Sequence, residues 1–201
     1  MSGPAGRRLI LASASHVRAR LLRAAGLEID VVPSAMDEAE LKKSAAHYDT
    51  ETLALRLARA KAEQVSYPHP ESYVIGADQI LDCDGTLFDK PIDRAAAADH
   101  LRRLRGRTHR LVTACVVAKA GATAWEHVSA PRLTMRDFSD AFLEEYLSHA
   151  GDDVTASVGA YKLEDVGAQL FERIEGDYFT ILGLPLLPLL SFLRQQGLVA
   201  A

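Results

Sequence analysis

The hydrophobic residues of this chain recur with two different spacings, which predict strands and helices. Short apolar or alternating runs predict strands at Arg8–Ala12, Leu27–Val32, Tyr73–Leu81, Leu111–Ala118, Glu126–Met135, Ala168–Glu175 and Tyr178–Leu182. Apolar residues three and four positions apart predict helices at Val17–Ala25, from Thr50 to about Val65, from Asp93 to about Arg105, after Ser139, and from Gly183 to Gly197. The runs at 111–118 and 126–135 are expected to pair as a long hairpin.

The stretch from Tyr73 to Pro91 carries the most informative pattern for a candidate ligand site. Its buried strand runs into Gly76, Ala77 and then the carboxylate of Asp78. The two small residues are expected to leave backbone space that a ligand beside Asp78 uses. An Asp-Gly turn then predicts a hairpin that returns Lys90 on the adjacent strand. One carboxylate and one ammonium in this arrangement suit a metal-bound polyphosphate; an ordinary surface charge pair is the alternative.

Composition and charge exclude several classes of protein. The 201 residues, 48% hydrophobic and 25% charged with a net charge of −4, are typical of a soluble globular chain. The sequence has no basic stripe with interleaved aromatic residues, so we expect no stable nucleic-acid binding. Cys83 and Cys115 lack the spacing of a zinc site and indicate a reducing compartment. The apolar run after Arg8 is too short for a signal peptide, and the run at 181–193 too short for a membrane span, so we expect a cytoplasmic protein with residues 1–7 loose.

A serine-rich turn follows the first predicted strand. Ser13 and Ser15 precede a helix whose first turn carries Arg18. Free backbone N–H groups at a helix start, together with hydroxyl and guanidinium donors, favour an anion. The alternative is that Ser15 serves only as the helix N-cap.

Other polar residues are weaker candidates. Asp37, Glu38 and Glu40 form an acidic loop that suits a hard divalent cation, unless it is merely solvated. Lys61 falls one step off the buried face of its helix and is either a surface lysine or a cation aimed into a cleft. His109, in a predicted turn, is more often a hydrogen-bonded structural histidine than a base.

The loop from Val158 to Gly167 is bracketed by glycines and carries Tyr161, Lys162 and Glu164. It is a candidate binding loop for a flat polar ligand, or equally a surface connection between two elements.

Taken together, these segments resemble the Maf-like nucleoside triphosphate pyrophosphatase family. The matching segments, in the order of the family, are Leu11–Ser15 with Arg18, Arg56–Ala58 with Lys61, Gly76–Asp78, Lys90-Pro91, Gly106–His109, Gly159–Tyr161, Phe171–Gly176 and Gly183–Leu186. The resemblance implies one α/β domain over residues 1–201, with a mixed, elongated sheet flanked by helices and two lobes around a central cleft. It also implies cleavage of a nucleoside triphosphate between the α- and β-phosphates, a divalent cation (Mg²⁺ or Mn²⁺) and a possible homodimer.

This chain departs from the family pattern at positions that bear on the substrate. Where most members read Ser-Pro-Arg-Arg, it reads Ser15-His16-Val17-Arg18, so Val17 replaces the first arginine. Gln79, Lys162 and Glu164 stand where the dTTP/UTP branch has Thr, Gly and Gln. These residues are closer to the branch that acts on 7-methyl-GTP, and a carboxylate such as Glu164 suits a guanine edge.

The resemblance leads to a mechanistic hypothesis. Asp78 and Glu38, or Asp37 or Glu40 in place of Glu38, bind the metal, and Asp78 activates a water. Arg18, Lys61 and Lys90 hold the triphosphate, with Ser13 and Ser15 as further donors. The alternatives are a dTTP/UTP or broad-specificity pyrophosphatase, a low-turnover nucleotide sensor that regulates cell division, and a phosphate-binding domain that serves a protein partner.

Overall fold

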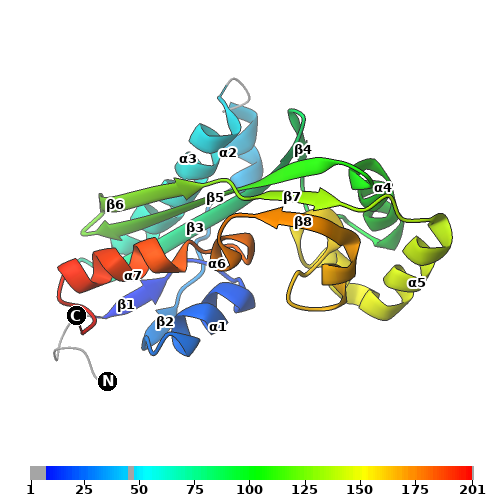
Figure 1. Ribbon diagram of the computed structural model, residues 1–201. Coiled ribbons are helices and arrows are strands. Elements are labelled where there is room, and N and C mark those ends of the chain that lie inside the picture. Colours follow the sequence, from blue (N-terminus) through cyan, green and yellow to red (C-terminus); the bar gives the residue numbers. More distant parts are fainter. Residues whose placement is uncertain (1–7, 45–47, 201) are drawn as a thin grey trace. The chain divides into compact units, whose positions relative to one another are not determined.

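The structure, a computed structural model, describes residues 8–44 and 48–200 (Figure 1). Its strands are β1 (Leu9–Leu11), β2 (Ile29–Val31), β3 (Tyr73–Cys83), β4 (Thr86–Phe88), β5 (Thr108–Lys119), β6 (Ala122–Ser129), β7 (Arg132–Met135) and β8 (Phe171–Glu175). Its helices are α1 (His16–Ala24), α2 (Glu38–Ser44), α3 (Thr50–Ser66), α4 (Arg94–Leu104), α5 (Asp140–Ala150), α6 (Tyr178–Ile181) and α7 (Leu186–Gln195). Three short 3-10 helices lie at Gly151–Thr155, Val158–Ala160 and Val166–Leu170.

The strands form a sheet in the order β2-β1-β3-β5-β7-β8, with β4 beside β3 and β6 beside β5. β1 runs parallel to β2 and β3, while the pairs made by β4, β6, β7 and β8 are antiparallel. The predicted α/β class with a mixed sheet flanked by helices is therefore confirmed.

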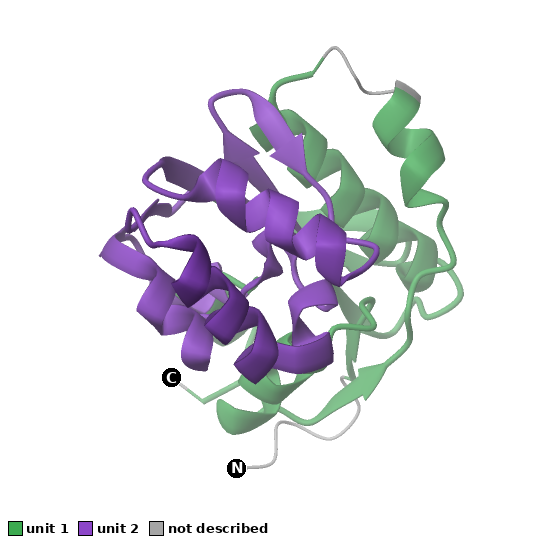
Figure 2. Ribbon diagram, turned by 90° about the vertical axis from the view of Figure 1, so that its right-hand side faces the viewer, with its two compact units in different colours: residues 1–78, 113–129, 183–201 green, residues 79–112, 130–182 purple. Residues whose placement is uncertain are grey.

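The contacts within the chain divide it into two compact units (Figure 2). Unit 1 comprises residues 1–78, 113–129 and 183–201, and unit 2 comprises residues 79–112 and 130–182. β3 and β5 each contribute residues to both units. The two units correspond to the two predicted lobes, whereas the assignment of residues 1–201 to a single domain stays a prediction. The expectation of a loose segment at 1–7 falls outside the described residues.

In unit 1, helix α3 has a buried stripe that includes Ala54, Leu57, Ala58, Lys61, Ala62 and Val65. These residues recur at helical spacing, so Lys61 lies on the buried stripe and not one step off it. The helix begins at an N-cap made by Asp49, whose carboxylate accepts the N–H of Thr52 at 2.7 Å. Thr50, predicted as the cap, is the first helical residue.

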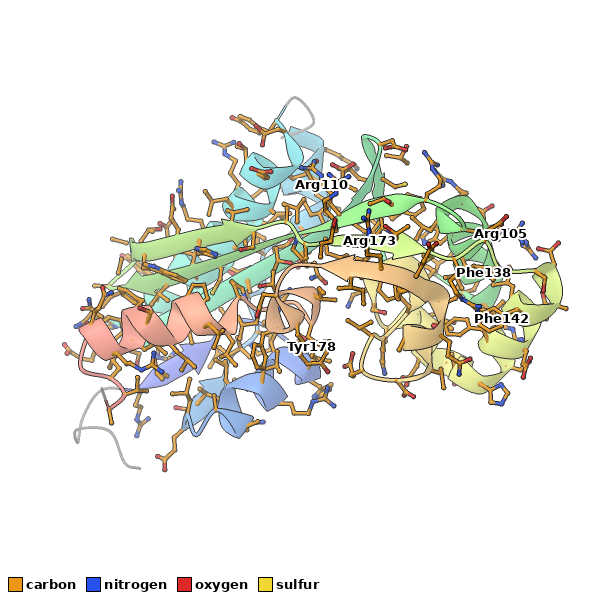
Figure 3. All side chains as sticks on the ribbon, in the orientation of Figure 1. Arg105, Arg110, Phe138, Phe142, Arg173 and Tyr178 are labelled. Carbon is orange, nitrogen blue, oxygen red and sulfur yellow. The ribbon has the colours of Figure 1, made fainter. Side chains whose placement is uncertain are left out.

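In unit 2, helices α4 and α5 pack in the same apolar cluster as Leu111, Leu133 and Met135 from strands β5 and β7. At the edge of this core, Arg105 lies beside Phe138 (Figure 3), and its Nη1 donates to the carbonyl of Phe138 at 3.0 Å. The same Nη1 donates to Asp140 at 2.8 Å. The guanidinium thereby ties the end of α4 to the N-terminus of α5.

One predicted strand is wrong, and two others are right only in part, since residues 168–170 of the predicted strand 168–175 belong to a 3-10 helix. In place of the predicted strand 178–182, residues Tyr178–Ile181 form helix α6, because the carboxylate of Asp177 caps it by accepting the N–H and the hydroxyl of Thr180 at 2.7 and 2.8 Å. The predicted strand 126–135 is broken at Ala130-Pro131 into β6 and β7, which pair with different parts of β5. Proline has no N–H for a sheet hydrogen bond, so the ladder stops there.

The acidic segment and the glycine-bracketed loop also differ from their predictions. Only the first part of the acidic segment is a loop, since helix α2 begins at Glu38. In the predicted loop 158–167, both ends are helical, because Val158–Ala160 and Val166–Leu170 form 3-10 helices. Among the described residues, no helix combines the length and apolar character needed to cross a membrane.

His109 is a buried structural residue of β5, which confirms that alternative, although it lies in a strand and not in a turn. Its Nε2 lies 2.7 Å from the hydroxyl of Tyr161, and its side chain is also close to the ring of Phe171. Within the described residues its Nδ1 has no hydrogen-bond partner. Burial lowers the pKa of His109 to about 4, so the imidazole is neutral in the folded protein at neutral pH.

This depressed pKa predicts a loss of stability in acid. The unfolded chain binds a proton at His109 near its usual pKa of 6.5, whereas the folded chain resists protonation until about pH 4. The free energy of unfolding should therefore fall by about 3 kcal/mol as the pH drops through this window. Denaturant titrations at pH 7 and pH 4.5 should show a smaller fall for His109→Gln, while the exposed His69→Gln should behave like the unchanged protein. An equal pH dependence for His109→Gln would contradict this account.

Candidate active site

The site is built on a close contact between α3 and β3 within unit 1. A Cβ atom added at Gly76 would lie 2.3 Å from the carbonyl oxygen of Ala58 and 2.7 Å from the amide nitrogen of Ala62. Only glycine permits this approach, because both obstacles are backbone atoms. The predicted space is thus filled at Gly76 by helix α3, so no ligand uses it there, while a ligand beside Ala77 and Asp78 stays a prediction.

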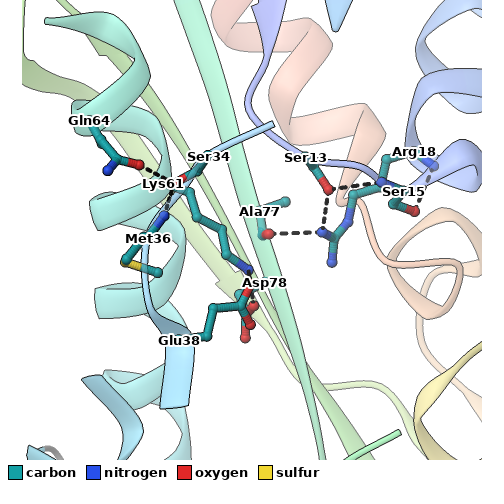
Figure 4. Close-up of polar contacts among 10 residues, drawn as sticks. All are labelled: Ser13, Ser15, Arg18, Ser34, Met36, Glu38, Lys61, Gln64, Ala77 and Asp78. Carbon is teal, nitrogen blue, oxygen red and sulfur yellow. Dashed lines mark hydrogen bonds and ion pairs between the residues drawn. The ribbon is translucent and has the colours of Figure 1, made fainter. Parts of the chain in front are cut away.

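The close approach brings Lys61 of α3 to Asp78 of β3. Lys61 Nζ lies 2.6 Å from Asp78 Oδ1 and 2.8 Å from Glu38 Oε1 (Figure 4). The side chains of Lys61 and Asp78 are each 9% exposed, while that of Glu38 is 48% exposed. A buried ammonium therefore lies between a buried carboxylate and a second one that reaches solvent.

Burial raises the pKa of Asp78 above its usual value, and the nearby charges of Lys61 and Arg18 oppose this effect without cancelling it. A carboxylate with a raised pKa accepts a proton more readily than an ordinary aspartate. Asp78 is thus suited chemically to act as a general base.

Two residues that the sequence analysis missed hold the segment before Glu38. The Ser34 hydroxyl donates to Gln64 Oε1 of α3 and accepts the N–H of Met36 at 3.2 Å (Figure 4). A serine in a loop is a weak turn signal, and nothing in the sequence links Ser34 to Gln64. This contact fastens the start of the acidic segment to the helix that carries Lys61.

The acidic segment presents one carboxylate to the cluster. Asp37 Oδ1 accepts the N–H of Glu40 at 3.0 Å, so Asp37 acts as a cap for α2, and Glu40 is exposed. Glu38 is the member of the segment that shares an ammonium with Asp78.

The donor set is compatible with a hard divalent cation. Across residues 8–44 and 48–200, no group of three or more His, Cys, Asp or Glu side chains is arranged to hold a metal. Two carboxylates that meet at one ammonium nevertheless suit Mg²⁺ or Mn²⁺, since Mg²⁺ is commonly held by one or two carboxylates together with water and substrate phosphates. Glu38 and Asp78 fit that pattern.

The serine-rich turn and Arg18 form a second cluster in unit 1. The hydroxyl of Ser15 accepts the N–H of Arg18 at 3.4 Å, which makes Ser15 the N-cap of α1. Arg18 Nη1 donates to Ser13 Oγ at 3.1 Å and to the carbonyl of Ala77 at 2.8 Å, and Arg18 Nε donates to the carbonyl of Gly183 at 2.8 Å (Figure 4). The sequence gives no sign of the two carbonyl acceptors, because every residue has one.

The remaining predicted residues belong to unit 2, except for the half-buried Val17 of α1. Gln79 Nε2 donates to the carbonyls of Thr180 and Ile181, both at 3.1 Å, so this amide group holds helix α6. Lys162 Nζ forms an ion pair with Asp153 at 2.6 Å.

Glu164 is half-buried, and Lys90 is exposed just after β4. The structure thus brings Asp78, Lys61 and Glu38 together, while the convergence of Lys90 on them stays a prediction.

Comparisons with known proteins agree with one another on the family. A family model described as "Maf-like protein" matches residues 8–196. A protein of Nitrobacter hamburgensis named "Nucleoside triphosphate pyrophosphatase" is 54% identical over 192 residues, which cover 96% of this chain and 95% of that protein. A protein of Rhizobium etli named "7-methyl-GTP pyrophosphatase" is 51% identical over 196 residues, which cover 96% of this chain and 98% of the relative.

A solved nucleoside-triphosphatase / dITP/XTP pyrophosphatase from Mycobacterium abscessus aligns with 65% of this chain and 75% of its own, with a TM-score of 0.36 and 17% identity, which is too distant to carry an argument. The match of the family model over nearly the whole described chain, together with relatives above 50% identity, establishes that this chain belongs to the Maf-like family.

Proposed function

We propose that the chain is a nucleoside triphosphate pyrophosphatase that acts on modified nucleotides, with 7-methyl-GTP as its preferred substrate. Membership of the Maf-like family and the names of its close relatives support the general activity. The observation that carries the proposal is the buried Asp78 carboxylate, which shares the Lys61 ammonium with Glu38.

Asp78 is the general base of the proposed reaction. Water attacks the α-phosphorus, Asp78 takes the proton of that water, and the bond from the α-phosphorus to the bridging oxygen breaks, so that pyrophosphate leaves. The raised pKa of Asp78 favours this proton transfer. Lys61 holds the carboxylate in place through its 2.6 Å contact.

The triphosphate is held by cations and hydroxyl groups. Arg18, Lys61 and Lys90 supply positive charge, and Ser13 and Ser15 supply hydroxyl donors at the start of α1. Both hydroxyls accept hydrogen bonds in the structure, and neither donates to any described residue, so both O–H groups are free to turn toward a phosphate.

Glu38 and Asp78 would hold the divalent cation. When bound, Mg²⁺ or Mn²⁺ supplies positive charge to the phosphate oxygens and lowers the pKa of water. The exposed side of Glu38 gives access from solvent.

The preference for 7-methyl-GTP rests on the residues that depart from the family pattern. Val17 contributes no charge where most members have arginine, and Glu164 offers a carboxylate to the base. Methylation at N7 gives guanine a positive charge. A carboxylate therefore binds 7-methylguanine more strongly than it binds neutral guanine. Gln79 would act by holding α6 through its two hydrogen bonds, and Lys162 by shaping its own loop. A homodimer and a cytoplasmic location stay predictions.

The first prediction concerns turnover. Asp78→Asn removes the base and Lys90→Ala removes a phosphate contact, so each should lower kcat by at least about 100-fold. The measurement is pyrophosphate release, with circular dichroism to verify folding. The exposed Asp30→Asn and Lys43→Ala variants are matched controls that should keep full activity. Near-normal turnover by folded Asp78→Asn would remove Asp78 from the role of base.

The second prediction concerns the metal. Glu38→Gln removes one of the two proposed carboxylate ligands and should weaken Mn²⁺ binding by about 10-fold or more. Asp37→Asn and Glu40→Gln should leave it unchanged, because these side chains do not reach Lys61. Isothermal titration with Mn²⁺ measures the affinity without substrate. If Asp37→Asn or Glu40→Gln weakens binding more than Glu38→Gln does, the ligand assignment is wrong.

The third prediction concerns the substrate. A panel of triphosphates assayed with and without chelator should give the highest kcat/KM for 7-methyl-GTP. Glu164→Gln should lower the preference of the enzyme for 7-methyl-GTP over GTP on the order of 5-fold, because a neutral acceptor binds a cationic base less well. Gln79→Thr combined with Glu164→Gln should shift the preference toward dTTP and UTP. Higher kcat/KM for dTTP or UTP in the unchanged protein would favour the alternative branch, and tight binding without pyrophosphate release would favour a nucleotide sensor.

A further inference from the structure

Three of the N–H donors of Arg18 are used inside the protein. Its Nη1 donates to Ser13 and to the Ala77 carbonyl, and its Nε donates to the Gly183 carbonyl. An arginine kept only to bind phosphate would leave its planar fork open toward the ligand. Among the described residues Nη2 has no hydrogen-bond partner, so one edge of the guanidinium is left for a ligand.

The Ala77 carbonyl lies where strand β3 loses its neighbour. The register of β1 with β3 ends at Leu11↔Ile75, and the last hydrogen bond of this edge runs from the Ala12 N–H to the Ile75 carbonyl at 2.8 Å. Carbonyls two residues apart point to the same edge of a strand, so the Ala77 carbonyl is the next acceptor. Arg18 takes the place of the missing strand there.

This contact acts directly on Asp78. The Ala77 carbonyl and the Asp78 amide belong to one planar peptide group. A hydrogen bond that holds this carbonyl therefore also fixes the orientation of the Asp78 backbone N–H. Asp78 is then held on both sides, by Arg18 through the backbone and by Lys61 through the carboxylate.

The contact of Arg18 with the Gly183 carbonyl depends on a glycine at that position. Gly183 has φ +97°, which side-chain-bearing residues rarely adopt, and a Cβ atom there would lie 3.4 Å from Arg18 Nε and 3.5 Å from Nη2. The guanidinium therefore packs against the backbone of the segment that leads into α7.

We propose that Arg18 is a positioning residue that holds the peptide preceding Asp78 against α1 and the Gly183 turn. This inference rests on the proposed function for its kinetic part, while the geometry stands independently of it. Val17, the neighbouring position where the usual arginine is absent, makes no such polar contact, which distinguishes the retained arginine from the replaced one.

The kinetic test compares Arg18→Ala and Arg18→Lys. Lysine keeps the charge and still binds phosphate, but a single ammonium on a flexible stem does not reproduce the planar three-way contact. Arg18→Lys should therefore lose kcat, on the order of 100-fold, with a much smaller change in KM, whereas Arg18→Ala should lose at least as much kcat and also raise KM, because it removes the phosphate-binding charge as well. Added guanidinium ion should restore part of kcat in Arg18→Ala, and ammonium ion should not. A raised KM with unchanged kcat, and full activity in Arg18→Lys, would overturn the proposal.

A second measurement does not depend on activity. Hydrogen–deuterium exchange of the peptide that spans residues 76–80 should speed up by about 10-fold or more in Arg18→Ala. The matched control is Arg23→Ala, an exposed arginine on the same helix, which should leave this exchange unchanged. If Arg18→Ala does not fold, Arg18→Lys takes its place in both measurements.

The two measurements separate the possible failures. Unchanged exchange in the Arg18 variants would refute the positioning role whatever the activity. Faster exchange in a protein that releases no pyrophosphate from any triphosphate would support the positioning role and refute the proposed function instead.

Discussion

The approach of helix α3 to strand β3 at Gly76 is the contact on which the candidate site depends. The helix backbone lies where any side chain at residue 76 would stand, so Lys61 reaches Asp78 at 2.6 Å. A buried ion pair costs desolvation energy that an apolar pair of the same volume would avoid. The pair is therefore poorly explained by stability alone, and its link to the half-exposed Glu38 indicates a functional reason to keep the charges.

Two polar contacts from different parts of unit 1 meet on consecutive residues of β3, and a third holds the segment that leads to the same cluster. Arg18 fixes the Ala77 carbonyl, Lys61 fixes the Asp78 carboxylate, and the Ser34–Gln64 contact fastens the segment that leads to Glu38. Each comes from a helix end, a helix face or a loop, while the strand supplies a rigid support. Such a scaffold holds catalytic groups within the small tolerances that chemistry requires.

Much of the local structure follows from the sequence because its signals act over a few residues. Asp93 and Ser139 cap the helices that they were expected to cap, and the Asp84-Gly85 turn joins β3 to β4. Residues 178–182 show the limit of this reasoning. Their apolar pattern suits a strand, but the capping carboxylate of Asp177 fixes a short helix instead.

The sequence by itself determined the family, the order of most strands and helices, and the residue types of the candidate site, because motifs and periodic patterns are local. Only the tertiary structure decided that the space at Gly76 receives a helix, that Glu38 is the acid beside Asp78, and that Arg18 binds backbone carbonyls. These contacts join residues up to 165 positions apart, and their acceptors include carbonyls that every residue carries. No sequence pattern marks such groups, since their meaning comes from the packing that brings them together.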